Sequence, residues 1–514
     1  MGKKLKIALI HLDVKYRDVK TNCDALIKLN QKACENGAKI IVNTEMGISG
    51  FSFLSMEKIA PCALSKKDKF IIHLKQIAKR YNAYICIGFA QKEENSSLFY
   101  NSAFVIGPVG RIILKYHKIN AETRWACPGN PVQDNIFETP WAKVGVLICS
   151  DTFHGLLPRQ TALKGADIII VPANWPLSGL DPNKLWSVRA RENGIYIAAC
   201  NRCGKDRIMI CDNAMSSVFS PDGKIMVSKA CIKSEIIYAS LPLNAQAKVK
   251  DITRPGIMAS RTPEKYGSIY LDMRHVNYDG SDLTAYYNLR APELFKIICF
   301  TGHAQFSKKD IVEKIRSFLD QPSKNFTLLV FPKVYAIQLD QLVPDISNII
   351  KGKNMAVCFG IIDKNGCMPV LISNESCSFA PYDAKGLCIV DTGPARIGLC
   401  RSHELMHPET GVAFAKLGCD ALITSLEYLS MEDLPIMASR TLDRICVAVS
   451  AENYAMISTP PTGHGPWKEV GASAPDFCSE NIDLEKIREK TFQDRVDFKI
   501  LLSININKTG KEKE

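Results

Sequence analysis

The chain lacks a long uninterrupted run of apolar residues. Its first residues, MGKKLKIALIHLDV, are basic at the start, but the short apolar run ends at His11 and Asp13. A secretory signal needs its own charged, apolar and small-residue regions, and a transmembrane helix needs about 20 apolar residues. We therefore expect no signal peptide and no membrane partner.

The chain also lacks the paired cysteines of a disulfide scaffold. Its 19 cysteines are scattered, and many lie in strand-like apolar runs such as YICIGFA and RICVAVS. Cys200 and Cys203 form a CxxC pair that could nucleate a zinc site, but no second pair stands at ligand spacing. We expect buried or loop cysteines, a cytoplasmic location, no metal and no organic cofactor.

Charge is not concentrated in one segment either. The formal net charge is +12, but the lysines are spread along the chain, and the densest cluster is the terminal NKTGKEKE. Because a nucleic-acid site needs a basic patch or stripe, we expect no nucleic-acid partner.

What the chain does have is length and an alternating pattern. With 514 residues, 46% of them hydrophobic, it can bury two substantial cores. The run KIALIHLDV is followed by a helical stretch at 22–35, which Gly37 ends, and by a strand at 39–43. This alternation predicts an α/β fold.

A similar order returns after residue 293, where FKIICFTGHAQF precedes a predicted helix at about 308–320. Aligned by eye, the two halves match at Lys6 and Lys296, Glu45 and Lys333, Gly88 and Gly360, Gly145 and Gly398, Gly165 and Gly418, and Arg189 and Arg440. The offset between matched positions falls along the chain, which indicates that the second copy has lost loops and kept its core. We predict one domain at 1–285 and a second at 292–514; two unrelated α/β domains are the alternative.

Three reactive residues in the first half each follow an apolar run. They are Glu45 in KIIVNTEMGISGF, Lys118 in ILKYHKINAE and Cys149 in KVGVLICSD. Strand ends fix a side chain while the following loop opens a pocket. Each residue alone has an ordinary structural explanation, but a carboxylate, an amine and a thiol together suit nucleophilic catalysis.

Over residues 5–270 these motifs resemble the nitrilase, or carbon–nitrogen hydrolase, superfamily. Besides the three runs above, the similar segments are PANWP at 172–176, RARENGIYIAACNRCG at 189–204, SSVFSPDGKI at 216–225 and RTPEKY at 261–266. The resemblance implies an αββα sandwich and a Glu–Lys–Cys catalytic set. It also implies that Glu122 helps to position the lysine and the substrate.

The chemistry implied by the resemblance needs these residue types. Glu45 would take the thiol proton from Cys149, give it to the departing nitrogen and later activate water. Lys118 would stabilise the anionic states, helped by the backbone N–H of Ser150. Trp175 could form a pocket wall, with a core tryptophan as a near-equal alternative.

Two departures from the family pattern concern the substrate. Ser150 stands where many relatives carry an aromatic residue, and Asn120 stands where histidine is common. Asp151 after the nucleophile favours amides or ureido compounds over nitriles. We therefore expect hydrolysis of a small linear amide or N-carbamoyl amine. Nitrile hydrolysis, transfer to an amine acceptor, and a non-catalytic scaffold are the alternatives.

The second copy lacks the same set of groups. It has Lys333 for the glutamate and Ser402 for the cysteine, while Tyr382 to Lys385 offer only a poor match to the lysine loop. Cys400 is expected to be a core cysteine. We predict an inactive copy that pairs with the first as a pseudo-dimer within one chain, with further self-association left open.

Overall fold

The computed structural model divides the chain into two compact units. The first contains residues 1–259 with 495–501, and the second contains residues 260–494. The structure describes residues 3–249, 253–273, 283–302, 306–319, 325–334, 339–363, 366–374, 376–380, 386–463, 465–490 and 492–503.

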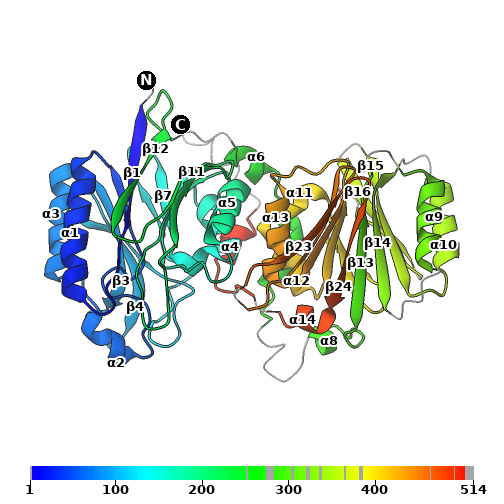
Figure 1. Ribbon diagram of the computed structural model, residues 1–514, viewed down its shortest axis with the longest axis horizontal. Helices are drawn as coiled ribbons and strands as arrows, with labels where there is room; N and C mark the ends of the chain where they lie inside the picture. The colour runs from blue at the N-terminus through cyan, green and yellow to red at the C-terminus, as the bar shows by residue number, and fades with distance from the viewer. Residues whose placement is uncertain are drawn as a thin grey trace. The chain divides into compact units, whose positions relative to one another are not determined.

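The first unit contains two six-stranded sheets within its described residues (Figure 1). One sheet has the order β12 (Glu235–Pro242), β1 (Lys4–His11), β2 (Ile40–Asn43), β3 (Tyr84–Lys92), β4 (Phe99–Ile106) and β5 (Ile112–His117). The other has the order β11 (Ile225–Ala230), β10 (Met215–Phe219), β9 (Tyr196–Cys200), β8 (Ile168–Pro172), β7 (Lys143–Val146) and β6 (Ile136–Glu138). Strands of the two sheets contact each other, so the sheets form the inner layers.

Helices cover the outer faces of this sandwich. Helices α1 (Val19–Glu35) and α3 (Lys69–Tyr81) lie side by side on the first sheet, and α4 (Leu156–Leu163) and α5 (Pro182–Asn193) cover the second. Asp18 caps α1 by accepting a hydrogen bond from the backbone N–H of Thr21, so the helix begins before the predicted residue 22. Apolar side chains of α1, including Leu26 and Ala33, pack on the sheet.

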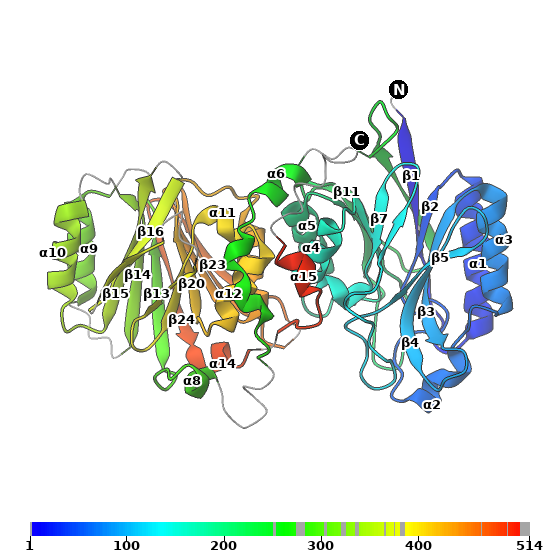
Figure 2. The same cartoon turned by 180° about the vertical axis from the view of Figure 1, so that it is seen from behind.

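The second unit repeats this architecture. Its first sheet has the order β24 (Phe477–Asp483), β13 (Leu294–Phe300), β14 (Phe326–Val334), β15 (Met355–Asp363), β16 (Gly366–Ile372) and β17 (Cys377–Phe379). Its second has the order β23 (Lys468–Ser473), β22 (Tyr454–Thr459), β21 (Cys446–Ser450), β20 (Ala421–Ser425), β19 (Arg396–Leu399) and β18 (Cys388–Asp391). Helices α9 (Lys308–Leu319) and α10 (Leu339–Ile350) cover the first sheet (Figure 2). The αββα sandwich prediction is confirmed.

Strand pairing supports the predicted repeat. In both units the three central strands of the first sheet run parallel, and the strands that flank them on either side pair antiparallel with them. Ile40 pairs with Tyr84, and Leu328 pairs with Ala356. Glu45 and Lys333 follow Ile40 and Leu328 by the same number of residues, so they occupy equivalent places.

The second sheets agree in the same way. Val144 pairs with Ile168, and Ile397 pairs with Ala421. Cys149 follows Val144 by the same number of residues as Ser402 follows Ile397, so the two residues occupy equivalent positions after their strands. Cys400 is fully buried, and its thiol donates to the carbonyl of Ile423 at 3.9 Å. It is a core cysteine, as predicted.

One matched pair of glycines has a shared packing reason. A Cβ on Gly145 would lie 2.3 Å from the Thr161 side chain, and a Cβ on Gly398 would lie 2.6 Å from Phe414. Both contacts are too short for real atoms, so each strand needs glycine where a helix packs on it.

The division between the units differs from the predicted boundary at residue 285. Residues 260–273 belong to the second unit, where Arg261 binds Glu409 and Lys265 binds Glu404, each at 2.8 Å. All four side chains are buried, so these charges hold the segment on the second sandwich. A periodicity argument cannot show ion pairs between residues so distant in sequence.

The carboxyl-terminal segment also differs from its predicted assignment. Residues 495–501 belong to the first unit, although the prediction placed them in the second domain. Arg495 donates to the carbonyl of Gly129 at 2.6 Å, and the backbone N–H of Asp497 donates to Gln160 at 2.9 Å.

Among the helices of the described residues, none has the length and apolar character that a membrane span requires.

Candidate active site

Glu45 lies two residues beyond the carboxyl end of β2. Its side chain is fully buried, and its backbone N–H donates to the carbonyl of Ala173, beyond β8, at 3.3 Å. Gly88 passes so close that a Cβ there would lie 2.9 Å from the Glu45 Cα. The absence of a side chain at Gly88 therefore makes room for the acid.

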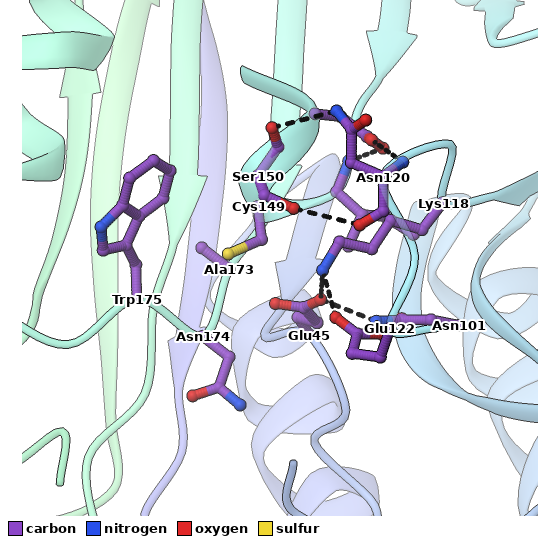
Figure 3. Close-up of polar contacts among 12 residues, drawn as sticks. Glu45, Asn101, Lys118, Asn120, Glu122, Cys149, Ser150, Ala173, Asn174 and Trp175 are labelled. Atoms are coloured by element: carbon purple, nitrogen blue, oxygen red, sulfur yellow. Dashed lines mark hydrogen bonds and ion pairs between the residues drawn. The ribbon is translucent and has the colours of Figure 1, made fainter. Parts of the chain in front are cut away.

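Lys118 follows β5 and brings its amine to this acid. Its Nζ lies 2.7 Å from Glu45 Oε1 and 2.6 Å from Glu122 Oε1, and only about 1% of the residue is exposed (Figure 3). The Nζ also lies 5.4 Å from the centre of the Phe51 ring, which adds a cation–π contact. Two carboxylates and an aromatic face thus surround one buried cation.

Cys149 lies in the turn that follows β7. Its backbone has φ of +47°, a left-handed conformation that is costly for a residue with a side chain. Thr152 donates its hydroxyl to the Cys149 carbonyl at 2.7 Å, which helps to hold the turn. In Figure 3 the thiol lies beside the Glu45 carboxyl group, with which it interacts, and the charge of Lys118 also acts on it. The structure thus brings together the three residues that the sequence selected.

Asp151 ties this turn to the loop that carries the lysine. It accepts a hydrogen bond from the Tyr116 hydroxyl at 2.8 Å and from the backbone N–H of Asn120 at 2.8 Å. Its other contacts include the backbone N–H of Ile148 at 3.3 Å. One buried carboxylate therefore fixes Cys149 and Lys118 relative to each other.

The electrostatic environment favours a protonated resting thiol. Burial, together with the charge of Glu45, raises the pKa of the Cys149 thiol well above its usual range, although Lys118 opposes the shift. Burial opposes the charge on Lys118, but Glu122 and Glu45 outweigh it and hold its pKa well above its usual range. Lys118 shares its charge with two carboxylates, so it does not by itself produce a thiolate.

The carboxyl group of Glu45 is also shifted. Burial is the largest cause and raises the pKa of Glu45, the charge of Glu122 raises it further, and Lys118 lowers it. A raised pKa makes a carboxylate a better proton acceptor. The arrangement therefore suits transfer of the thiol proton to Glu45 during attack on a substrate.

The three supporting residues lie around this centre. Glu122 is part of the ion-pair cluster, and the Ser150 hydroxyl donates to the carbonyl of Asn120 at 3.3 Å. Trp175 is half-buried, with its ring stacked on Phe153 at a centroid distance of 6.2 Å. It lies on the other side of Cys149 from Lys118 in Figure 3. That position is compatible with a pocket wall.

Sequence reasoning missed two contributors to the cluster. Asn101 donates its amide to Glu45 at 2.7 Å, and Asn174 donates its backbone N–H to the Cys149 thiol. Asn101 lies inside a strand rather than at its end, and a backbone N–H has no signature in the sequence. Only the Asn–Ser break in the apolar run FYNSAFVI could have drawn attention to Asn101.

The sequence also singled out a CxxC pair and, in the second copy, a weak match to the lysine loop. Cys200 and Cys203 are buried, and the Cys200 thiol donates to the carbonyl of Ile10 at 3.2 Å. Residues 381–385, which include the weak match to the lysine loop in the second copy, lie outside the described residues.

By fold, the chain is an α/β protein built from two nitrilase-type sandwiches. The model of the carbon-nitrogen hydrolase family matches residues 6–251. A Schizosaccharomyces pombe protein named "Probable nitrilase C965.09" is 32% identical over 253 residues, covering 47% of this chain and 90% of that protein. The chain therefore belongs to the carbon–nitrogen hydrolase family, whose enzymes act on non-peptide C–N bonds.

Other relatives match to a similar extent. Omega-amidase NIT2-B of Xenopus laevis is 27% identical over 251 residues, covering 45% of this chain and 86% of that protein. Among solved structures, Saccharomyces cerevisiae Nit3, a member of branch 10 of the nitrilase superfamily, aligns with a TM-score of 0.42 and 23% identity, covering 47% of this chain and 90% of that one.

Proposed function

We propose that the first unit hydrolyses small linear amides or N-carbamoyl amines, with Cys149 as the nucleophile, and releases ammonia. The observation that carries the proposal is the buried cluster in which Lys118 lies 2.7 Å from Glu45 while the Cys149 thiol faces the same carboxyl group. Relatives named omega-amidase and 2-oxoglutaramate amidase support an amide substrate.

The first half-reaction forms a thioester. Glu45 accepts the thiol proton as the sulfur attacks the substrate carbon, which gives a tetrahedral intermediate with a negative oxygen. Lys118 and the backbone N–H of Ser150 stabilise that oxygen. The C–N bond then breaks, and the proton held by Glu45 passes to the nitrogen, which leaves as ammonia.

The second half-reaction restores the enzyme. Glu45 takes a proton from water, the resulting hydroxide attacks the thioester carbon, and the C–S bond breaks. The proton returns to the sulfur and the acid product leaves. Glu122 keeps the Lys118 amine in place through both steps, and Trp175 forms one side of the substrate pocket.

Nitrile hydrolysis is the second candidate. A Pyrococcus abyssi relative named nitrilase is 29% identical over 243 residues. The same thiol could attack a nitrile carbon. True nitrilases, however, carry glutamate at the position of Asp151, so we rank amides first. A non-catalytic scaffold is disfavoured because all three reactive groups are present and in contact.

We propose that the second unit is catalytically inactive. Lys333 replaces the acid and Ser402 the thiol, so neither a carboxylate base nor an acidic nucleophile stands in the equivalent places. The expectation that residues 293–514 support the first domain stays a prediction. A fragment of residues 1–285 tests it, since a soluble and fully active fragment would contradict the need for a partner.

Release of ammonia tests the function. The full chain is incubated with a panel of linear amides, ureido compounds and nitriles, with Cys149→Ala as the control. Ammonia from amides or ureido compounds that requires Cys149 supports the proposal, and consumption of nitriles alone supports the second candidate. If no compound is consumed and Cys149 shows no enhanced reactivity towards thiol reagents, the scaffold explanation replaces both.

A further inference from the structure

Asn101 connects the two carboxylates of the cluster. It lies in β4 with no exposed surface, and its Nδ2 donates to Glu45 Oε1 at 2.7 Å and to Glu122 Oε2 at 3.1 Å (Figure 3). An amide nitrogen has two hydrogens, so these two bonds use its full donor capacity. Its backbone carbonyl accepts from the N–H of Lys118 at 2.8 Å. Asn101 therefore contacts every charged member of the cluster.

The contacts of Asn101 make the two oxygens of Glu45 different. Oε1 accepts hydrogen bonds from both Asn101 and Lys118. Oε2 is buried and accepts no hydrogen bond from a nitrogen or hydroxyl donor of the described residues, whereas the Cys149 thiol interacts with the Glu45 carboxyl group and lies on the side of its second oxygen in Figure 3. A buried oxygen without a donor is costly unless a proton or a substrate group satisfies it.

We propose that Asn101 is a positioning residue that turns Glu45 so that Oε1 is held by two donors and Oε2 is left to exchange protons with the Cys149 thiol. The inference rests on the proposed function, because it assigns Asn101 a task only if Glu45 acts as the base. Asn101 touches neither the thiol nor the substrate carbon in this assignment, and it acts through Glu45.

The charge balance of the cluster agrees with this task. Burial raises the pKa of Glu45, and the hydrogen bond from Asn101 is one of the interactions that lower it, after Lys118. A donor that favours the ionised carboxylate keeps the base available at lower pH. Loss of Asn101 should therefore move the acid limb of Cys149 reactivity to higher pH.

The second unit provides an internal comparison. Ala90 pairs with Asn101, and Ile362 pairs with Cys367 at the equivalent place in β15 and β16. The copy that has lost the carboxylate thus also lacks the amide, since a thiol cannot donate two N–H bonds. The two replacements are consistent with Asn101 and Glu45 serving one purpose.

Alkylation of Cys149 by iodoacetamide tests the proposal without a known substrate. The rate is measured across pH in the full chain by mass spectrometry of the Cys149 peptide, for wild type, Asn101→Ala and the isosteric Asn101→Asp. The matched control is Ser102→Ala, because Ser102 is the next residue of β4, is equally buried and loses a single hydrogen bond to Gln91. Ammonia release is measured across pH in parallel once an amide is found.

We expect both Asn101 variants to move the acid limb to higher pH, so that alkylation on this limb slows about tenfold, with Asn101→Asp affected more because it adds a third carboxylate. Ser102→Ala should keep the wild-type profile. Wild-type profiles in both Asn101 variants, or an equal shift in Ser102→Ala, would overturn the proposal. Failure of both variants to fold would also overturn it, because Asn101 would then be a folding residue.

One outcome separates this inference from the proposed function. If wild-type Cys149 reacts no faster than the buried Cys86, the nucleophile assignment itself fails, and the role of Asn101 falls with it. If wild-type Cys149 reacts fast but the Asn101 variants keep its pH profile, only the inference about Asn101 is wrong.

Discussion

The two units share one fold but differ in charge at the same strand ends. In the first, Glu45 lies beyond β2, and Asn174 and Arg202 lie two residues beyond β8 and β9. In the second, the equivalent places hold Lys333 and, two residues beyond β20 and β21, Glu427 and Glu452. Lys333 forms ion pairs with both glutamates, the one to Glu452 measuring 3.5 Å. In the second unit, the residue at the position of Glu45 and the residues around it therefore both differ in charge from those of the first unit.

The backbone differs at the nucleophile as well. Cys149 has a left-handed φ of +47°, whereas Ser402 begins a regular helix, α11 (Ser402–Leu405). A strained residue persists only where the surrounding contacts impose it, and such residues concentrate at functional sites. The second unit has lost both the thiol and the strained turn.

Contacts that serve the fold are kept in both units. Arg189 donates to the carbonyl of Thr152 at 2.9 Å, and Arg440 donates to the carbonyl of Leu405 at 3.0 Å. The comparison therefore separates what the sandwich needs from what the chemistry needs. Matched substitutions in the two units can test this separation.

Substitution of the two aligned nucleophile positions should give the largest contrast. We expect Cys149→Ala to reduce ammonia release by at least about four orders of magnitude, because the thioester cannot form. Ser402→Ala should leave the rate within twofold of wild type, since Ser402 has no part in the reaction. Steady-state ammonia assays on both variants check this, and a large loss in Ser402→Ala would mean that the second unit is active.

Substitution at the acid position should give the next largest contrast. We expect Glu45→Gln to lower kcat by about 10²–10⁴-fold through loss of the base. Lys333→Gln should leave kcat unchanged, because Lys333 has no part in the proposed reaction, although the change removes the cation that pairs with Glu427 and Glu452. Kinetics combined with thermal unfolding would contradict the comparison if Lys333→Gln lowered kcat as Glu45→Gln does.

The sequence predicted the α/β class, the repeat and three members of the cluster. Periodicity located β2 and α9 within a residue or two, and Glu45, Lys118 and Cys149 were visible because each follows an apolar strand. The fold and the proximity of the three side chains could be predicted where local pattern and family motif pointed to the same residue, and the catalytic roles stay proposals.

Other features depend on contacts that no local pattern encodes. The unit boundary follows from Arg261 and Lys265, whose partners lie more than a hundred residues away. Asn101 looks like any polar residue in a strand until β4 is paired with β3. The raised pKa of Cys149 comes from burial and from the charge of Glu45, which Lys118 only partly offsets, and these effects require the three-dimensional arrangement.

The retained arginines should give equal effects on folding but unequal effects on activity. We expect Arg189→Ala and Arg440→Ala each to lower the stability of their own unit by about 2 kcal/mol or more, because each removes the donor of at least one buried carbonyl. Only Arg189→Ala should also lower kcat, since Thr152 braces the Cys149 turn. Denaturant unfolding and ammonia assays test both parts. Equal loss of kcat in the two variants would contradict a purely structural role for Arg440.

The smallest expected effect is a shift in pH dependence. Glu45 can act as a base only when ionised, so the rate should fall as pH drops through its pKa, which burial and then the charge of Glu122 raise. Glu122→Gln removes that charge, and Glu45 becomes the only carboxylate of the cluster that pairs with Lys118. The pKa of Glu45 should therefore fall, and the acid limb of kcat/KM should move to lower pH. Glu427→Gln is the matched control, because it removes a carboxylate beside a buried lysine in the second unit and should leave the profile unchanged. A limb that moves to higher pH in Glu122→Gln would show that Glu45 is not the group whose ionisation controls the rate.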